Sequence, residues 1–320
     1  MTHRYEAFGL AIRSNRPLPA LRRSKTTGAD LRVEFAEGRE PEVDPLAAGT
    51  TPYTGSGSVR ACDDGSRVLR YASHGGESVW SMRVSADGGS IEVRWRGPIE
   101  VADIAAFVET TGLPTALALR GVPVLHGCAV DTGGAAFLVL GAGGSGKSTL
   151  AAAAVARGHA VLTDDIAALD GAGADVLVQP GDTYLRMNED TARALGWDPA
   201  ELRRVFVTPE LPRKLFAPLW SGDGSLCGDA RRMAAIFVLG ERRSGPLTID
   251  RLAPVDALPV LLRNTYGDRA VDGRVRAPLL PFWTRLARDV PVHAVTPPDG
   301  LAAAPSLVDA LAAAGGGLAG

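Results

Sequence analysis

The sequence predicts an α/β protein whose N-terminal part is rich in β-strands. Short strand-like runs, separated by glycine-containing turns, fill the chain up to about residue 97. From residue 122 onward, strand-like runs alternate with helical ones, which is the pattern of an α/β core. With 320 residues, the chain is long enough for one large domain or two of ordinary size.

The N-terminal part is expected to form a β-rich domain of its own, residues 1–100, and to help recognise an extended peptide, because exposed strands can pair with an added one. The Pro- and Gly-rich stretch 38–58 indicates a long surface loop. The spacing of apolar residues predicts a helix over 101–120, which Pro114 kinks or splits. We therefore place a domain boundary near residue 100, with this helix leading into the second domain. The strands expected before it cover 5–13, 30–35, 58–61, 67–72, 78–84 and 91–95.

The second part, residues 101–301, begins its strand pattern with a hairpin. Two apolar runs, 122–131 and 135–141, are joined by the turn Asp131-Thr132-Gly133-Gly134. A glycine loop, an alanine-rich helix and the strand HAVLTDD follow. The tail 302–320 is low in complexity and is expected to be flexible. Further strands are expected at ADVLVQP, AAIFVLGER and LTIDRLA, and helices at EDTARALGW and PVDALPVLLRNTYG.

Composition narrows the class of function. The formal net charge of -2 argues against nucleic acid or an anionic membrane surface as the main partner, because both need a basic excess. No apolar run reaches the length of a membrane span and the N-terminus lacks a signal-peptide pattern, so we expect a cytoplasmic protein. The cysteines Cys62, Cys128 and Cys227 are too widely spaced for a disulfide framework or a metal-ligand pattern.

The glycine loop carries the clearest chemistry. Residues 141–148, GAGGSGKS, satisfy the pattern G-x-x-x-x-G-K-[ST] between an apolar strand and a strong helix former. Glycines allow backbone N–H groups to converge on phosphates at a helix N-terminus, while Lys147 supplies a cation and Ser148 a hydroxyl for Mg²⁺. Lysine is otherwise rare, with only Lys25 and Lys214 besides. We therefore predict ATP and Mg²⁺ binding by Gly141, Gly143, Gly144, Ser145, Gly146, Lys147, Ser148 and Thr149.

An acidic pair follows at the end of the next predicted strand. Asp164 and Asp165 come 17 and 18 positions after Lys147. If HAVLT pairs beside FLVL, both carboxylates lie next to the γ-phosphate, because groups at the carboxyl end of one strand lie beside the loop that leaves its neighbour. One carboxylate can then hold Mg²⁺ and the other can accept a proton from an attacking hydroxyl.

His126 lies on the first arm of the predicted hairpin, whose second arm enters the glycine loop. A lone His in an apolar strand is commonly a core residue. Here it is also placed to reach the γ-phosphate or the acidic pair, and its residue type does not decide between the two. The other histidines, His3, His74, His159 and His293, carry no comparable pattern.

These residues in this order resemble one known family. The segment VLHGCAVDTGGAAFLVLGAGGSGKSTLAAAAVARGHAVLTDDIAAL is similar to the catalytic domain of HPr kinase/phosphorylase. It contains, in this order, a strand with His126, a hairpin, the P-loop and a strand that ends in the Asp164–Asp165 pair. That family shares its P-loop architecture with phosphoenolpyruvate carboxykinase. The resemblance implies that His126 and Asp164 belong to a phosphotransfer centre, with Asp164 as general base. It also implies Mg²⁺ held by Ser148 and the acidic pair, with Asp165 on the metal side.

The remainder of the chain departs from the bifunctional enzyme. The stretch Glu-[Ile/Val]-Arg-Gly-x-Gly, associated there with phosphorolysis, is missing. The opening 5–21 and the stretch 178–197 look more like HPr kinase-related proteins of peptide tailoring, including the kinases of lasso-peptide precursors. This resemblance implies transfer of the γ-phosphate of ATP to a serine hydroxyl of a peptide or protein, and in particular of a ribosomal, lasso-type peptide precursor. A small-molecule kinase and a non-catalytic nucleotide-binding regulator remain as alternatives.

Several charged and aromatic residues leave their roles open. Lys214 and Arg213 are either contacts for a substrate carboxylate or phosphate, or solvated cations. The sequence also leaves the oligomeric state open, a homo-oligomer included. Arg186, Arg231 and Arg232 are weaker candidates for such contacts, and we expect them at the surface. We expect core or interface packing for Trp197, Trp220 and Trp283, and the sequence does not select one of them to stack on adenine.

Overall fold

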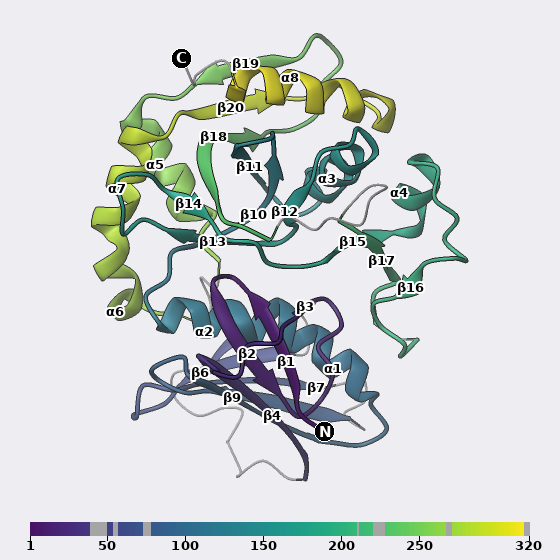
Figure 1. The fold of residues 1–320 in the computed structure, drawn as a ribbon, viewed down its shortest axis with the longest axis vertical. Coiled ribbons are helices and arrows are strands. Elements are labelled where there is room, and N and C mark those ends of the chain that lie inside the picture. Colours follow the sequence, from purple (N-terminus) through teal and green to yellow (C-terminus); the bar gives the residue numbers. More distant parts are fainter. Residues whose placement is uncertain are drawn as a thin grey trace. The chain divides into compact units, whose positions relative to one another are not determined.

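The computed structural model describes residues 1–38, 50–53, 57–72, 78–209, 211–219, 228–266 and 271–316. The chain forms two compact units (Figure 1). The N-terminal unit contains Met1–Val122, Val205–Arg213 and Tyr266–Pro278, and the remaining residues form the C-terminal unit. The expected boundary near residue 100 therefore differs from the structure, because the helical segment after it and two later segments pack with the first unit.

The N-terminal unit is built on one nine-stranded sheet in the order β3-β1-β2-β4-β9-β8-β7-β6-β5. The predicted strand 5–13 is in fact two strands, since Phe8 and Gly9 adopt φ of 57° and 76° and turn the chain back. The strands are β1 (His3–Ala7), β2 (Leu10–Ser14), β3 (Arg22–Arg23), β4 (Leu31–Glu37), β5 (Thr50–Tyr53), β6 (Gly57–Ala61), β7 (Arg67–Ala72), β8 (Val79–Val84) and β9 (Ser90–Arg96).

A broken helix covers one face of this sheet. It consists of α1 (Val101–Phe107), a π-helical turn η1 (Val108–Gly112) and α2 (Leu113–Leu119). Pro114 lies at the start of α2 and has no N–H to donate to the backbone of the preceding turn. The helix is interrupted at this point, so the predicted split is confirmed. A Cβ on Gly112 would lie 3.3 Å from Met82 Sδ, which shows how closely the helix approaches the sheet.

The later segments join the N-terminal unit through specific contacts with this helix. Asp103, fully buried, accepts hydrogen bonds from the backbone N–H groups of Val207 (2.6 Å) and Thr208 (2.9 Å). The ring of Phe206 lies 5.4 Å from that of Phe107. These contacts are non-local, which is why the sequence pattern alone did not assign 205–213 to this unit.

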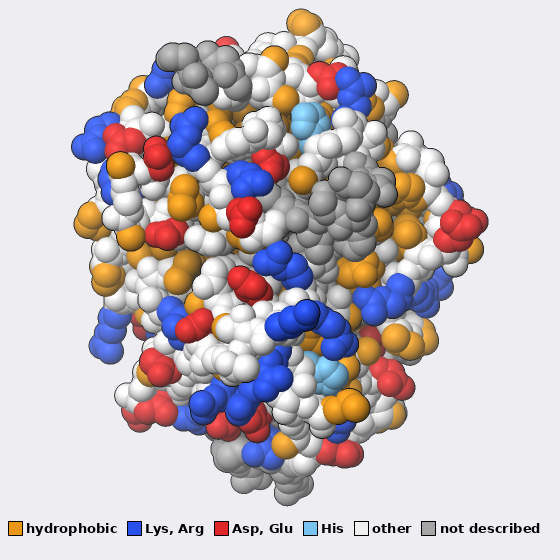
Figure 2. Space-filling model, in the orientation of Figure 1, with side chains coloured by type: hydrophobic (Ala, Val, Ile, Leu, Met, Phe, Trp, Pro, Cys, Tyr) orange, Lys and Arg blue, Asp and Glu red, His pale blue; other side chains and the backbone are white. Residues whose placement is uncertain are grey.

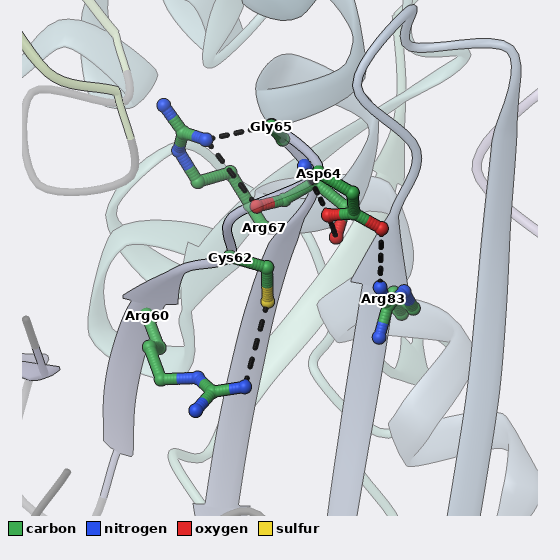
Figure 3. A network of polar contacts seen from close by, with 7 residues as sticks. Arg60, Cys62, Asp64, Gly65, Arg67 and Arg83 are labelled. Carbon is green, nitrogen blue, oxygen red and sulfur yellow. Dashed lines mark hydrogen bonds and ion pairs between the residues drawn. The ribbon is translucent and has the colours of Figure 1, made fainter.

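The turn between β6 and β7 is held by a polar network (Figure 3). Asp64 accepts from the Ser66 hydroxyl at 2.6 Å and forms an ion pair with Arg83 at 2.6 Å. The Ser66 hydrogen bonds and the Arg83 guanidinium lower the pKa of Asp64 to about 2. The carboxylate therefore stays ionised in the turn.

The exposed face of the same sheet carries a row of arginines. Arg4 stands directly opposite Arg13 on the neighbouring strand, and Arg13 opposite Arg32. None of the three forms an ion pair within the part of the chain that the structure describes. Like charges that face each other across strands are unfavourable. Figure 2 shows Lys and Arg side chains gathered on this side of the unit, over β1 to β3.

The C-terminal unit is built on an eight-stranded mixed sheet, β11-β10-β13-β14-β18-β20-β19 with β12 beside β10. β11 also pairs in parallel with β18, so five of its strands form a closed circuit of pairings. The predicted hairpin is confirmed, with Gly127 opposite Leu140. The strands are β10 (Val124–Asp131), β11 (Ala135–Gly141), β12 (Val161–Thr163), β13 (Ile166–Asp170), β14 (Leu177–Val178), β18 (Arg231–Leu239), β19 (Thr248–Arg251) and β20 (Val292–Thr296).

Helices cover both faces of this sheet. Along β11, Phe137 and Val139 pack into one core cluster, and Leu138 and Leu140 into the other, as the alternation of a strand requires. The first cluster lies under α3 (Lys147–Ala156) and α8 (Ala304–Gly316), and the second under α5 (Pro254–Arg263) and α7 (Leu280–Asp289). The sheet is thus the central layer of an α/β sandwich.

Helix α8 corrects the expectation of a flexible tail from residue 302. Within Ala304–Gly316, Leu307, Val308 and Leu311 are buried in the cluster under α3. The alanine-rich composition reads as low complexity, but alanine is the strongest helix former and its small side chain allows close packing on α3. Residues 317–320 lie outside the described part of the chain.

The remaining elements lie beside this sandwich. A small sheet, β15-β17-β16, joins β15 (Tyr184–Asn188), β16 (Arg203–Arg204) and β17 (Lys214–Pro218), and α4 (Glu189–Ala194) follows β15. Among the helices that the structure describes, none is both long and apolar enough to span a bilayer. Cys227, Trp220, His74 and much of the predicted loop 38–58 lie outside the described residues. The short elements are α6 (Gly273–Arg276), η2 (Ala277–Leu279) and η3 (Leu301–Ala303).

Candidate functional site

The glycine loop connects the end of β11 to the start of α3. Gly141 adopts φ of 150°, and a Cβ there would lie 2.7 Å from Ser145 Oγ and 3.0 Å from the carbonyl oxygen of Leu239. Gly146, with φ of 102°, is the N-cap of α3. Both positions require glycine, one for space and the other for its left-handed backbone. The N-terminal turn of α3, whose first N–H groups have no partner within the helix, therefore opens onto this loop.

Lys147 folds back over the loop that precedes it. Its Nζ donates to the carbonyl oxygens of Gly141 (2.7 Å) and Ala142 (3.2 Å), and its side chain is buried. Burial lowers the pKa of Lys147, and the Asp165 carboxylate partly opposes that shift. The ammonium is thus held by loop carbonyls at the place where the motif predicts phosphate.

His126 shares the α3 face of β10. Alternation along the strand puts His126 on the same side as Cys128 and Val130, which pack against α3. Its Nδ1 lies 3.2 Å from the main-chain oxygen of Asp165. Burial lowers the pKa of His126, so the ring is neutral near pH 7. The structure therefore brings His126 next to the acidic pair.

The strand before the acidic pair has a different neighbour from the one predicted. β12 pairs with β10, with Ala129 opposite Thr163, and does not pair with β11. β13 continues along β10, with His126 opposite Ile166. Asp164 and Asp165 therefore interrupt one long antiparallel strand instead of ending a parallel one. The strand whose carboxyl end does lie beside the glycine loop is β18.

The two aspartates have different surroundings. Asp165 lines the same cavity as Lys147 and His126. Asp164 is 1% exposed and does not line that cavity. Its Oδ2 accepts from the N–H of Arg186 at 3.0 Å, while Oδ1 has no hydrogen-bond partner among the described residues. Burial, together with the negative charge of Asp165, raises the pKa of Asp164 to about 7.

One cavity of about 590 Å³ collects most of the predicted site. Four cationic side chains line it, and Asp165 is the only acidic one among its described lining residues. The cavity is therefore suited to a polyanion. Its lining residues are His126, Gly143, Gly144, Gly146, Lys147, Ser148, Thr149, Asp165, Arg186, Met187, Asn188, Thr191, Lys214, Arg242 and Gly300.

Some predicted residues lie outside this lining. Ser145 is not part of it, and its buried hydroxyl makes no hydrogen bond within the described residues. Lys214 lines the cavity, whereas its neighbour Arg213 is exposed, belongs to the N-terminal unit and is not a lining residue. The pairing of Lys214 with Asn188 on β15 accounts for this difference.

Sequence reasoning misplaced one arginine and missed another. Arg186, expected at the surface, is 4% exposed, forms an ion pair with Asp182 at 3.3 Å and lines the cavity. Arg242 follows the end of β18 and also lines the cavity. The predicted strand AAIFVLGER carried the signal for Arg242, because a parallel neighbour of β11 must end beside the glycine loop.

Comparison with known proteins finds a likeness in structure but no match in sequence. No family model matches the chain, and no curated protein matches it. Among solved structures with a similar arrangement is the Hpr(Ser) kinase/phosphatase from Coxiella burnetii, at 12% sequence identity and a TM-score of 0.29. The match covers 59% of this chain and 92% of that one.

Proposed function

We propose that this protein is a magnesium-dependent phosphotransferase that uses ATP. The observation that carries the proposal is the placement of Lys147 and Asp165 on one cavity with the glycine loop and the N-terminus of α3. A triphosphate needs backbone N–H groups, a lysine and a metal ligand in one place. Here they come from residues that are close in sequence and converge in the fold.

The residues present fit a magnesium–nucleotide complex. Mg²⁺ is commonly bound by one or two protein oxygens, with phosphates and water completing its shell. Ser148 and Asp165 supply such oxygens on the cavity wall. Among the described residues there is no cluster of three or more His, Cys, Asp or Glu side chains, as a protein-only metal cage would need. The bound nucleotide would supply the transferable phosphoryl group and the remaining metal ligands.

The protein's own groups divide the chemistry. Asp165 is the carboxylate on the cavity, so we assign to it the contact with the metal or with the acceptor proton. Asp164, the general base implied by the resemblance, is enclosed behind it, and we assign to it the positioning of the Arg186 backbone. His126 holds the Asp165 main chain in place. Lys147 would leave the loop carbonyls for the β/γ-phosphates.

The acceptor that we propose is a serine hydroxyl of a peptide or protein, as in peptide-tailoring kinases. The row of Arg4, Arg13 and Arg32 on the N-terminal unit favours an acceptor with an acidic segment. The alternative is a small-molecule kinase, for which this row would be irrelevant. A nucleotide-binding regulator that transfers no phosphate is the other alternative.

The experiment is to incubate the full-length protein with ATP·Mg²⁺ and a panel of serine peptides, in which acidic and neutral versions of each sequence are matched. The gain of one phosphate is read by intact mass. We expect transfer to acidic peptides, and weaker transfer as salt concentration rises. ATP binding without transfer to any peptide or small hydroxyl compound would favour the regulator.

A further inference from the structure

Arg242 is tied to the glycine loop by strand pairing. β18 runs parallel to β11, and Leu239, its last residue, is paired with Gly141. The two chains therefore leave the sheet at the same edge, one into the glycine loop and the other into the segment that carries Arg242. This position follows from the core of the sheet and does not depend on a long loop.

The guanidinium of Arg242 lies against the last glycine of that loop. A Cβ placed on Gly146 would collide with Nη2 of Arg242 and would lie 3.5 Å from its Cζ. Nη1 donates to the carbonyl oxygen of Gly300 at 3.1 Å, which fixes the plane of the group. Arg242 forms no ion pair within the residues that the structure describes, although the side chain is half-buried on the cavity wall. A positioned cation with no carboxylate partner indicates an anionic ligand.

We propose that Arg242 is a second phosphate-binding residue, which contacts the α/β-phosphate part of the bound nucleotide; this rests on the proposed function. In glycine loops of this type, the backbone N–H groups surround the α- and β-phosphates, while the lysine reaches the β- and γ-phosphates. Arg242 stands at Gly146, within the N–H-bearing loop. Its planar fork of donors suits two phosphate oxygens at once.

The place of Arg242 on the nucleotide determines whether its loss changes KM or kcat. A contact on the α-phosphate side of the nucleotide, away from the bond that breaks, changes little between the ground state and the transition state. Its loss raises KM for ATP and leaves kcat nearly unchanged. A contact to the transferred phosphoryl group would instead lower kcat. ADP and ATP should therefore lose affinity to the same extent.

The test compares the full-length protein with Arg242→Gln and with Arg243→Gln, the matched control. Arg243 is adjacent, exposed and not a lining residue. Calorimetry with ADP·Mg²⁺ and ATP·Mg²⁺ should show affinities about ten- to hundredfold weaker for Arg242→Gln, as expected for loss of a charged hydrogen bond. Arg243→Gln should stay within about twofold. Without nucleotide, the thermal midpoints of all three proteins should agree.

Three results would overturn the inference while the wild type still binds ATP. The first is an unchanged nucleotide affinity in Arg242→Gln. The second is a lower kcat in this variant while its affinity for ADP is retained. The third is a lower thermal midpoint of the variant, which would explain the loss of affinity by destabilisation around Gly300. If the wild type binds neither nucleotide, the proposed function itself fails, and the two failures are therefore distinguishable.

Discussion

The Nδ1 atom of His126 lies 3.2 Å from the main-chain oxygen of Asp165, and the N–H of Gly127 donates to that same oxygen at 3.2 Å. A carbonyl oxygen only accepts, so the hydrogen bond places the ring proton on Nδ1. The histidine strand therefore fixes the backbone of the acidic pair directly, through two adjacent donors.

Replacing His126 tests whether it positions Asp165 or takes part in transfer. His126→Asn keeps an N–H donor near the Nδ1 position, whereas His126→Ala removes it. If His126 is a positioning residue, turnover falls about tenfold or more in the Ala variant and recovers largely in the Asn variant. Equal loss in both variants, with unchanged ATP affinity, would indicate that the ring itself acts on the reacting groups.

The aspartates should separate in their effects on activity. Asp165→Asn removes the only acidic group among the cavity's described lining residues, so we expect turnover to fall about 100- to 10,000-fold, the range for loss of a proton acceptor or metal contact. Asp164→Asn keeps an oxygen acceptor for the Arg186 N–H and should cost less. The measurement is kcat together with the Mg²⁺ concentration for half-maximal rate. A larger loss of kcat in Asp164→Asn than in Asp165→Asn would indicate that Asp164 is the general base.

Asp164 should also set a pH dependence of stability. Its folded pKa of about 7 lies above its ordinary 3.8, so between these values the native state holds a proton that the unfolded chain has lost. The native state is therefore stabilised fully at pH values below 3.8, and this stabilisation is lost as the pH rises through the folded pKa of about 7. Asp164→Asn lacks this loss. Urea unfolding without Mg²⁺ or nucleotide should show the variant gaining on the wild type from pH 4 to pH 7, and a constant difference would contradict the assignment.

Helix α8 should be required for the stability of the C-terminal unit. Leu311 is fully buried under α3, so Leu311→Ala should lower the free energy of unfolding by about 2–5 kcal/mol. Leu280, 47% exposed on α7, provides the matched control, and Leu280→Ala should have little effect. Equal effects in chemical denaturation would mean that α8 does not pack as described.

The elements of the site could be predicted from the sequence because each of them forms from residues that are close together in the chain. The hairpin, the glycine loop and the helix after it follow from turn residues and apolar periodicity within a few tens of residues. His126 falls on the α3 face because of strand alternation alone. The motif also required Gly141 and Gly146 to be glycines, and the structure gives the physical reasons, which are a close contact and a left-handed backbone.

The misplaced features depend on pairing between distant strands. The neighbour of β12 is β10, and no local pattern chooses between β10 and β11. Arg242 was missed for the same reason. It is 95 positions after Lys147 and reaches the loop only because β18 is parallel to β11. Arg186 was assigned to the surface because its burial depends on Asp182 and Asp164, whose place in the fold is non-local.

The most direct test of the central claim is calorimetry of ATP·Mg²⁺ binding to the full-length protein and to Lys147→Ala, with Lys25→Ala as the control on an exposed lysine. The account predicts saturable binding by the wild type and by Lys25→Ala. For Lys147→Ala it predicts affinity about ten- to hundredfold weaker, since a charged contact to the phosphates is lost. Equal ATP affinity in wild type and Lys147→Ala, or no binding by the wild type, would contradict it.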